Sequence, residues 1–170
     1  NFILLPIDKG GSLLFNLLLA PESKIIEDAH CPVIALPEKT MFKPYKNIVY
    51  ASNHQRKDLL TLNKLLGVFR MQNPAIKVFH VHQEKNLKSK ISDTGFEKLL
   101  DEKLEYDNIS YESIYGEDVA QESTNYAKQV DADLIVTLKD EHNFLERLFN
   151  KDSVLKLIKN LTVPLMVFHK

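Results

Sequence analysis

Residues 29–37 read Ala-His-Cys-Pro-Val-Ile-Ala-Leu-Pro, and their centre, Val33–Leu36, is an apolar run of strand length that ends at Pro37. The same order returns at the end of the chain. A shift of 132 positions (164 − 32 = 132) places Pro32 on Pro164, Val33 on Leu165, Ile3 on Ile135, Asp8 on Asp140, Lys24 on Lys156 and Ile26 on Ile158. We therefore predict that the first 38 residues are a second copy of the last 38, so that the end of one domain precedes a complete second one.

Strand-like and helix-like patterns alternate along the chain. Strands are predicted at 2–7, 33–36, 47–52, 76–82, 109–114, 133–138 and 163–168, and helices at 13–28, 57–71, 93–105, 117–130 and 144–160. Residues 38–46, which include Pro44, read as a linker. Regular alternation with apolar strands is typical of a parallel sheet that is covered by helices on both faces.

The order of elements, the length of the second series and the run at 29–37 resemble the universal stress protein family. The resemblance implies an open parallel five-stranded sheet of order 3-2-1-4-5, preceded here by an extra βαβ segment. It assigns residues 1–38 to the end of a first domain and residues 39–170 to a complete second domain, and we expect the chain to be part of a longer protein.

In this family the last strands pair antiparallel across a dimer or tandem interface. The resemblance therefore predicts that strands 33–36 and 163–168 pair about a pseudo-two-fold axis, within one chain or between two. The expected interface residues are Val33, Ile34, Leu36, Leu165 and Val167. Either a homodimer or self-association of tandem domains follows.

One branch of the family binds ATP through a strand-one aspartate and a glycine-rich loop after strand four. Here the aspartate position is Asn53, residues 138–143 contain no glycine, and Asp140, Glu141 and Asp152 add negative charge where phosphates would sit. The first copy keeps two glycines at 10–11 but has none in its later loop, 19–22. We expect no cofactor; ATP is the alternative. Its candidate contacts are Ser52, Asn53, Val81, Lys139 and Ser153.

Other clusters favour ordinary interpretations. His80 and His82 share one strand face and could begin a metal site with His142 or His169, but strand-edge histidines usually make ordinary hydrogen bonds, so no metal is expected. His82 and Asn53 are nevertheless expected to line a pocket, because ligands bind at the carboxyl edge of such sheets. No catalytic residue is predicted, since Ser52 and His54 have no nucleophile turn or orienting acid. The lysines of 85–90 are read as a solvated loop.

Composition sets the remaining limits. The net charge of −1 gives no reason to expect binding to nucleic acid or to an anionic membrane. The single cysteine, Cys31, excludes an intrachain disulfide, and no apolar run reaches about 18 residues. We expect a cytoplasmic, non-catalytic stress-response protein that acts through association with partners that the sequence does not identify. A nucleotide-binding regulator or weak ATPase is the alternative.

Overall fold

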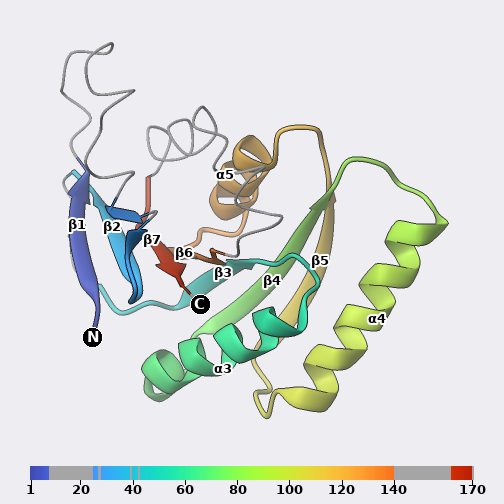
Figure 1. Cartoon of the computed structure of the whole chain (residues 1–170), viewed down its shortest axis with the longest axis horizontal. Coiled ribbons are helices and arrows are strands. Elements are labelled where there is room, and N and C mark those ends of the chain that lie inside the picture. Colours follow the sequence, from blue (N-terminus) through green and yellow to red (C-terminus); the bar gives the residue numbers. More distant parts are fainter. Residues whose placement is uncertain (8–24, 27, 39, 42, 140–161, 170) are drawn as a thin grey trace.

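The alternation seen in the sequence forms one layered α/β structure (Figure 1). The structure is a computed structural model that describes residues 1–7, 25–26, 28–38, 40–41, 43–139 and 162–169. Its strands are β1 (Ile3–Ile7), β2 (Val33–Pro37), β3 (Asn47–Ala51), β4 (Ala75–His82), β5 (Ile109–Tyr115), β6 (Leu134–Leu138) and β7 (Leu165–Phe168). Its helices are α3 (Arg56–Phe69), the 3-10 turn η1 (Arg70–Gln72), α4 (Leu87–Lys103) and α5 (Val119–Gln129). The predicted helix at 144–160 and most of that at 13–28 lie outside the described residues.

The strands of the described residues form a single sheet with the order β1-β2-β7-β6-β3-β4-β5. Every neighbouring pair is parallel except β2 and β7, which are antiparallel. From β3 onward, the order is the predicted 3-2-1-4-5, which is confirmed. The extra segment does not stand apart from this sheet, because β1 and β2 extend it to seven strands.

Helices cover both faces of the sheet, as predicted, and each face has its own apolar core. On one face α3 and α4 pack against alternate residues of the central strands, with Leu62 and Phe96 meeting Tyr50 and Val78. On the other face α5 packs against the intervening residues, with Tyr126 meeting Phe79. Figure 1 shows α5 above the sheet and α3 below it. Successive residues of β4 therefore point to different cores, which decides the direction of its histidines.

The pair β1–β2 and the pair β6–β7 have the same register. Ile3 lies opposite Val33, and Ile135 lies opposite Leu165, so a shift of 132 (3 + 132 = 135; 33 + 132 = 165) carries one pair onto the other. Each pair also starts with the same backbone hydrogen bond of 2.9 Å, from Ile3 to Pro32 and from Ile135 to Pro164. The ends that match in sequence thus also match in geometry.

These two pairs meet about a local two-fold axis between β2 and β7. Ile34 lies opposite Met166, its own counterpart under the shift (34 + 132 = 166), and Val33 lies opposite Val167. The structure therefore pairs the two closing strands within one chain. Val33 and Val167 are fully buried there.

Helix α4 begins at Leu87, six residues before the predicted start at Asp93. Asn86 accepts a hydrogen bond from the Ser89 amide at 2.9 Å, and the Ser89 hydroxyl accepts one from the Asn86 amide at 3.1 Å, so the two residues form a reciprocal cap. The prediction of a loop across residues 85–90 was therefore wrong for its second half, which lies in the first turn of the helix. This early start brings α4 over the carboxyl ends of the strands.

Candidate functional site

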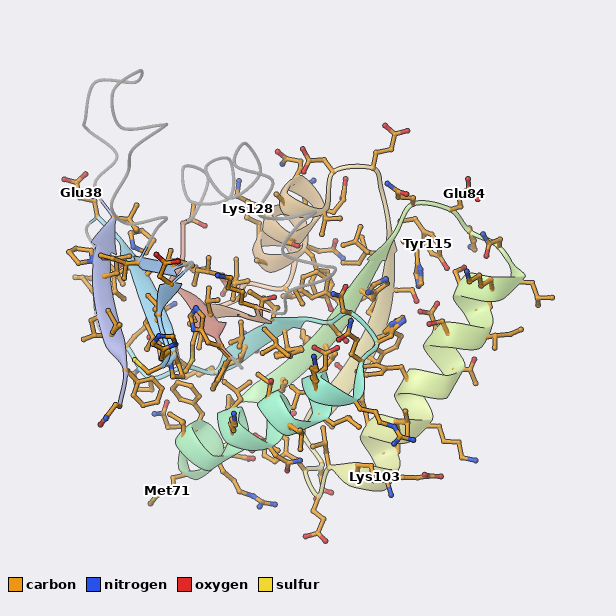
Figure 2. The ribbon with its side chains drawn as sticks, viewed as in Figure 1. Glu38, Met71, Glu84, Lys103, Tyr115 and Lys128 are labelled. Carbon is orange, nitrogen blue, oxygen red and sulfur yellow. The ribbon has the colours of Figure 1, made fainter. Side chains whose placement is uncertain are left out.

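A pocket of about 490 Å³ opens at the carboxyl ends of β3 and β4, beside the start of α4. It is lined by Asn53, His54, His80, His82, Gln83, Glu84, Asn86, Lys88, Ser89 and Ser92. Figure 2 shows Glu84 and Tyr115 at this end of the sheet, opposite Met71 and Lys103 at the far ends of α3 and α4. The carboxyl edge of the sheet therefore has a pocket, and Asn53 and His82 line it as predicted.

The loop between β3 and α3 is built around the buried carboxylate of Asp58. Its oxygens accept hydrogen bonds from the Tyr50 hydroxyl at 2.8 Å and from the Ser52 hydroxyl and the Asn53 and Gln55 amides at 3.0 Å each. An acid in the first turn of a helix is also favoured by the helix dipole. These contacts hold His54, whose φ of 59° lies in the left-handed region, so that its ring faces β4.

Three histidine rings gather on the α3/α4 side of the sheet. The ring centroids of His54 and His80 lie 4.1 Å apart, those of His80 and His82 4.5 Å, and those of His54 and His82 5.5 Å. One ring nitrogen from each of the three lies within 4.8 Å of those of the other two. The Phe96 ring of α4 covers His54 at 4.9 Å.

One carboxylate, Asp93 of α4, joins this cluster to β5. Asp93 Oδ1 lies 2.7 Å from His82 Nε2 and accepts a hydrogen bond of 2.6 Å from the Tyr111 hydroxyl. The same hydroxyl lies 2.6 Å from His54 Nε2, and the Ser92 hydroxyl lies 2.7 Å from His54 Nδ1. Residues from the β3–α3 loop, β4, β5 and α4 therefore share one network.

Burial favours the neutral form of two of these rings, and hydrogen bonds favour the charged form of the carboxylate. Burial, together with the neighbouring His80, lowers the pKa of His54 to about 3. Burial also lowers the pKa of His80. Burial alone would raise the pKa of Asp93, but hydrogen bonds from Ser113, Tyr111 and His82 outweigh it and lower that pKa.

The predicted nucleotide contacts do not all meet at this pocket. Asn53 lines it, but Ser52 is fully buried and its hydroxyl donates to Asp58. Val81 packs in the core on the α5 face, away from His80 and His82. Lys139 follows β6, where its amide donates to the Phe168 carbonyl at 2.8 Å. Ser153 and the acidic residues at 140, 141 and 152 lie outside the described residues.

Sequence reasoning missed two members of the cluster. It considered His142 or His169 as the third histidine, whereas the ring that joins His80 and His82 is His54. His169 instead lies 2.7 Å from the Ile26 carbonyl, and His142 lies outside the described residues. The orienting acid that the sequence did not place is Asp93. The capping pattern that starts α4 at Asn86 was the signal that could have located it.

Comparisons with known proteins bear on the fold. No family model matches the sequence, and no curated protein matches it. Among solved structures, a universal stress protein from Archaeoglobus fulgidus is similar over 99% of this chain and 60% of its own length, with a TM-score of 0.76 and 13% identity. This chain thus spans about three fifths of that protein.

Shorter universal stress proteins match the greater part of the chain. One, solved in complex with cAMP, is similar over 75% of this chain and 98% of its own, with a TM-score of 0.57 and 12% identity. Another, from Lactobacillus plantarum, covers 75% of this chain and 99% of its own, with a TM-score of 0.51 and 16% identity. Among the helices of the described residues, none has the length and apolarity needed to cross a membrane.

The similarity to these solved structures shows that the chain has the fold of the universal stress proteins.

Proposed function

We propose that this protein is a non-catalytic stress-response protein of the universal stress type, which acts through association between two domains of this fold. The observation that carries the proposal is the local two-fold axis between β2 and β7. Two strand pairs of identical register meet there, centred on Ile34 and Met166. This supports the assignment of residues 1–38 to the end of a first domain and residues 39–170 to a second.

The edge strand β1 supplies the surface for association. Under the shift of 132, β1 corresponds to β6, and β6 has β3 on its outer side, with Ile135 opposite Val49. Within the described residues, the outer side of β1 has no strand partner. The proposal places a strand equivalent to β3 there, from a first domain of the same protein or from a second copy of the chain.

The apolar character of this edge supports that assignment. Leu4 is 63% exposed and Phe2 is 45% exposed, and both line an apolar hollow with Ile34 and Leu36. An exposed strand edge with large apolar side chains favours pairing with another chain. The purified 170-residue chain should therefore associate reversibly.

Sedimentation equilibrium of the chain tests this. Leu4→Asp should weaken association at least about tenfold, because it places a charge where about 1–2 kcal/mol of apolar burial is expected. Leu60→Asp is the matched control, because Leu60 is 65% exposed on α3 and does not line that hollow. A chain that stays monomeric at all concentrations, or equal effects of the two variants, would refute the proposal.

Nucleotide binding is the second candidate, because Asn53 lines the pocket and one similar structure holds cAMP. Any ligand that binds the native state raises its melting temperature. Thermal melts with millimolar Mg-ATP, and separately with cAMP, decide between the candidates. An increase that Asn53→Ala abolishes and the exposed Asn63→Ala keeps would favour the nucleotide regulator. No increase is expected from the association proposal.

A further inference from the structure

The hydrogen bonds around the histidines assign a proton to one nitrogen of each ring. A carbonyl oxygen only accepts, so His80 Nδ1, which lies 2.5 Å from the Ser52 carbonyl, must carry a proton. The ionised Asp93 carboxylate also only accepts, so His82 Nε2 carries one at 2.7 Å. The lone pairs of these two rings therefore lie on His80 Nε2 and His82 Nδ1.

The third ring follows from the Tyr111 hydroxyl. Its single proton goes to Asp93, so its oxygen accepts from His54 Nε2 at 2.6 Å. His54 Nδ1 is then left to accept from the Ser92 hydroxyl at 2.7 Å. All three rings and Ser92 line the same pocket.

This is the arrangement that metal-binding histidines show, with one nitrogen on the metal and the other ring N–H on a carboxylate or carbonyl. We propose that His54, His80 and His82 form a site for a divalent metal ion of the Zn²⁺ class. Asp93 acts as the orienting carboxylate, directly on His82 and through Tyr111 on His54. The Ser52 carbonyl orients His80.

The distances permit this with small movements. One ring nitrogen of each histidine lies within 4.8 Å of one ring nitrogen of each of the other two. Around a tetrahedral Zn²⁺ with Zn–N bonds of about 2.0–2.1 Å, they would lie about 3.3 Å apart. Binding therefore draws these nitrogens together by up to about 1.5 Å (4.8 − 3.3 = 1.5). Among the hydrogen bonds of the described residues, the one from Ser92 to His54 Nδ1 must be exchanged.

The donor chemistry selects the class of ion. Neutral imidazoles suit Zn²⁺, Ni²⁺ and Cu²⁺, whereas Mg²⁺ and Ca²⁺ prefer oxygen ligands. Burial keeps His54 and His80 in the neutral form that ligates. The pocket side of the cluster leaves room for a fourth ligand, such as water or an added anion.

The test uses the metal-stripped 170-residue chain, titrated with Zn²⁺ in competition with a chromophoric chelator. One Zn²⁺ per chain is expected. His80→Gln and His82→Gln should each weaken binding by at least about a hundredfold, and Asp93→Asn by about 10–100-fold. His30→Gln is the control, because His30 is exposed and lies outside the cluster; it should leave the affinity unchanged.

Two further readouts do not depend on how well the variants fold. Co²⁺ bound to the unmodified chain should give the intense visible absorption of four-coordinate Co²⁺, and millimolar Mg²⁺ should not displace it. A weak octahedral spectrum, displacement by Mg²⁺, or Zn²⁺ binding no tighter in the unmodified chain than in folded His80→Gln would overturn the proposal. The site lies within one domain, so its failure leaves the association proposal intact, and the reverse also holds.

Discussion

Replacing Asp58 by alanine should be among the most damaging polar substitutions in this chain. Asp58 is 2% exposed and receives four hydrogen bonds, two from side-chain hydroxyls and two from backbone amides. The hydroxyls belong to Tyr50 and Ser52, which are both fully buried and cannot turn to water. The amides of Asn53 and Gln55 lie in the partly exposed loop, where water can replace the carboxylate.

The magnitude follows from the two hydroxyls. Leaving a buried donor without a partner costs about 1–3 kcal/mol, so the pair costs about 2–6 kcal/mol, and the lost helix-dipole interaction adds less than about 1 kcal/mol. Asp58→Asn keeps one acceptor oxygen and should lose about 1–3 kcal/mol. Asp101→Ala removes an exposed acid from α4 and should change stability by less than about 0.5 kcal/mol.

Urea unfolding at neutral pH, followed by circular dichroism, measures these differences. The m-value should stay constant, so that the midpoint shift reports stability alone. A loss below about 1 kcal/mol for Asp58→Ala, equal to that of Asp101→Ala, would show that the hydroxyls find other partners and that Asp58 does not build the loop.

Three other perturbations test separate parts of the sheet. Asp133 accepts backbone hydrogen bonds at the start of β3 and forms an ion pair of 2.5 Å with Lys43. Burial alone would raise the pKa of Asp133, but these contacts outweigh burial and lower it. The stabilisation from Asp133 is therefore present above about pH 4 and is lost as the pH falls through the folded pKa. Asp133→Asn should therefore flatten the acid limb of a stability–pH curve measured by urea unfolding, and an unchanged limb would contradict this. Val33→Asp buries a charge at the β2–β7 junction and should unfold the chain in circular dichroism, not release a folded remainder. Phe79→Ala removes a fully buried ring whose centroid lies 4.9 Å from that of Tyr126. It should lower the free energy of unfolding by about 3–5 kcal/mol in the same assay, and a loss under about 1 kcal/mol would be inconsistent with this packing.

Much of the fold could be predicted because its signals are local. Buried parallel strands such as β3 and β6 read as nearly continuous apolar runs, and amphipathic α3 repeats at helical spacing. The start of α4 was missed because its first turns expose Leu87 and Ile91, so the apolar face becomes visible only at Phe96. There the cap at Asn86, and not hydrophobic periodicity, sets the boundary.

The site was less accessible to prediction because its contacts are long-range. The sequence shows that His80 and His82 share a face, since that follows from the period of a strand. It does not show that His54 turns back over them, because this depends on a left-handed backbone held by Asp58. Nor does it show that Asp93 reaches His82, because that depends on where α4 crosses the sheet.

Two carboxylates, those of Asp58 and Asp93, hold the residues around this pocket in place. Asp58 fixes the loop that carries His54, and Asp93 ties His82 and Tyr111 to α4. Both carboxylates accept hydrogen bonds from protein donors. The three imidazoles line the pocket together with side chains such as Asn53, Glu84 and Lys88. Imidazole nitrogens suit transition metals such as Zn²⁺, whereas phosphates need a glycine-rich, positively charged frame.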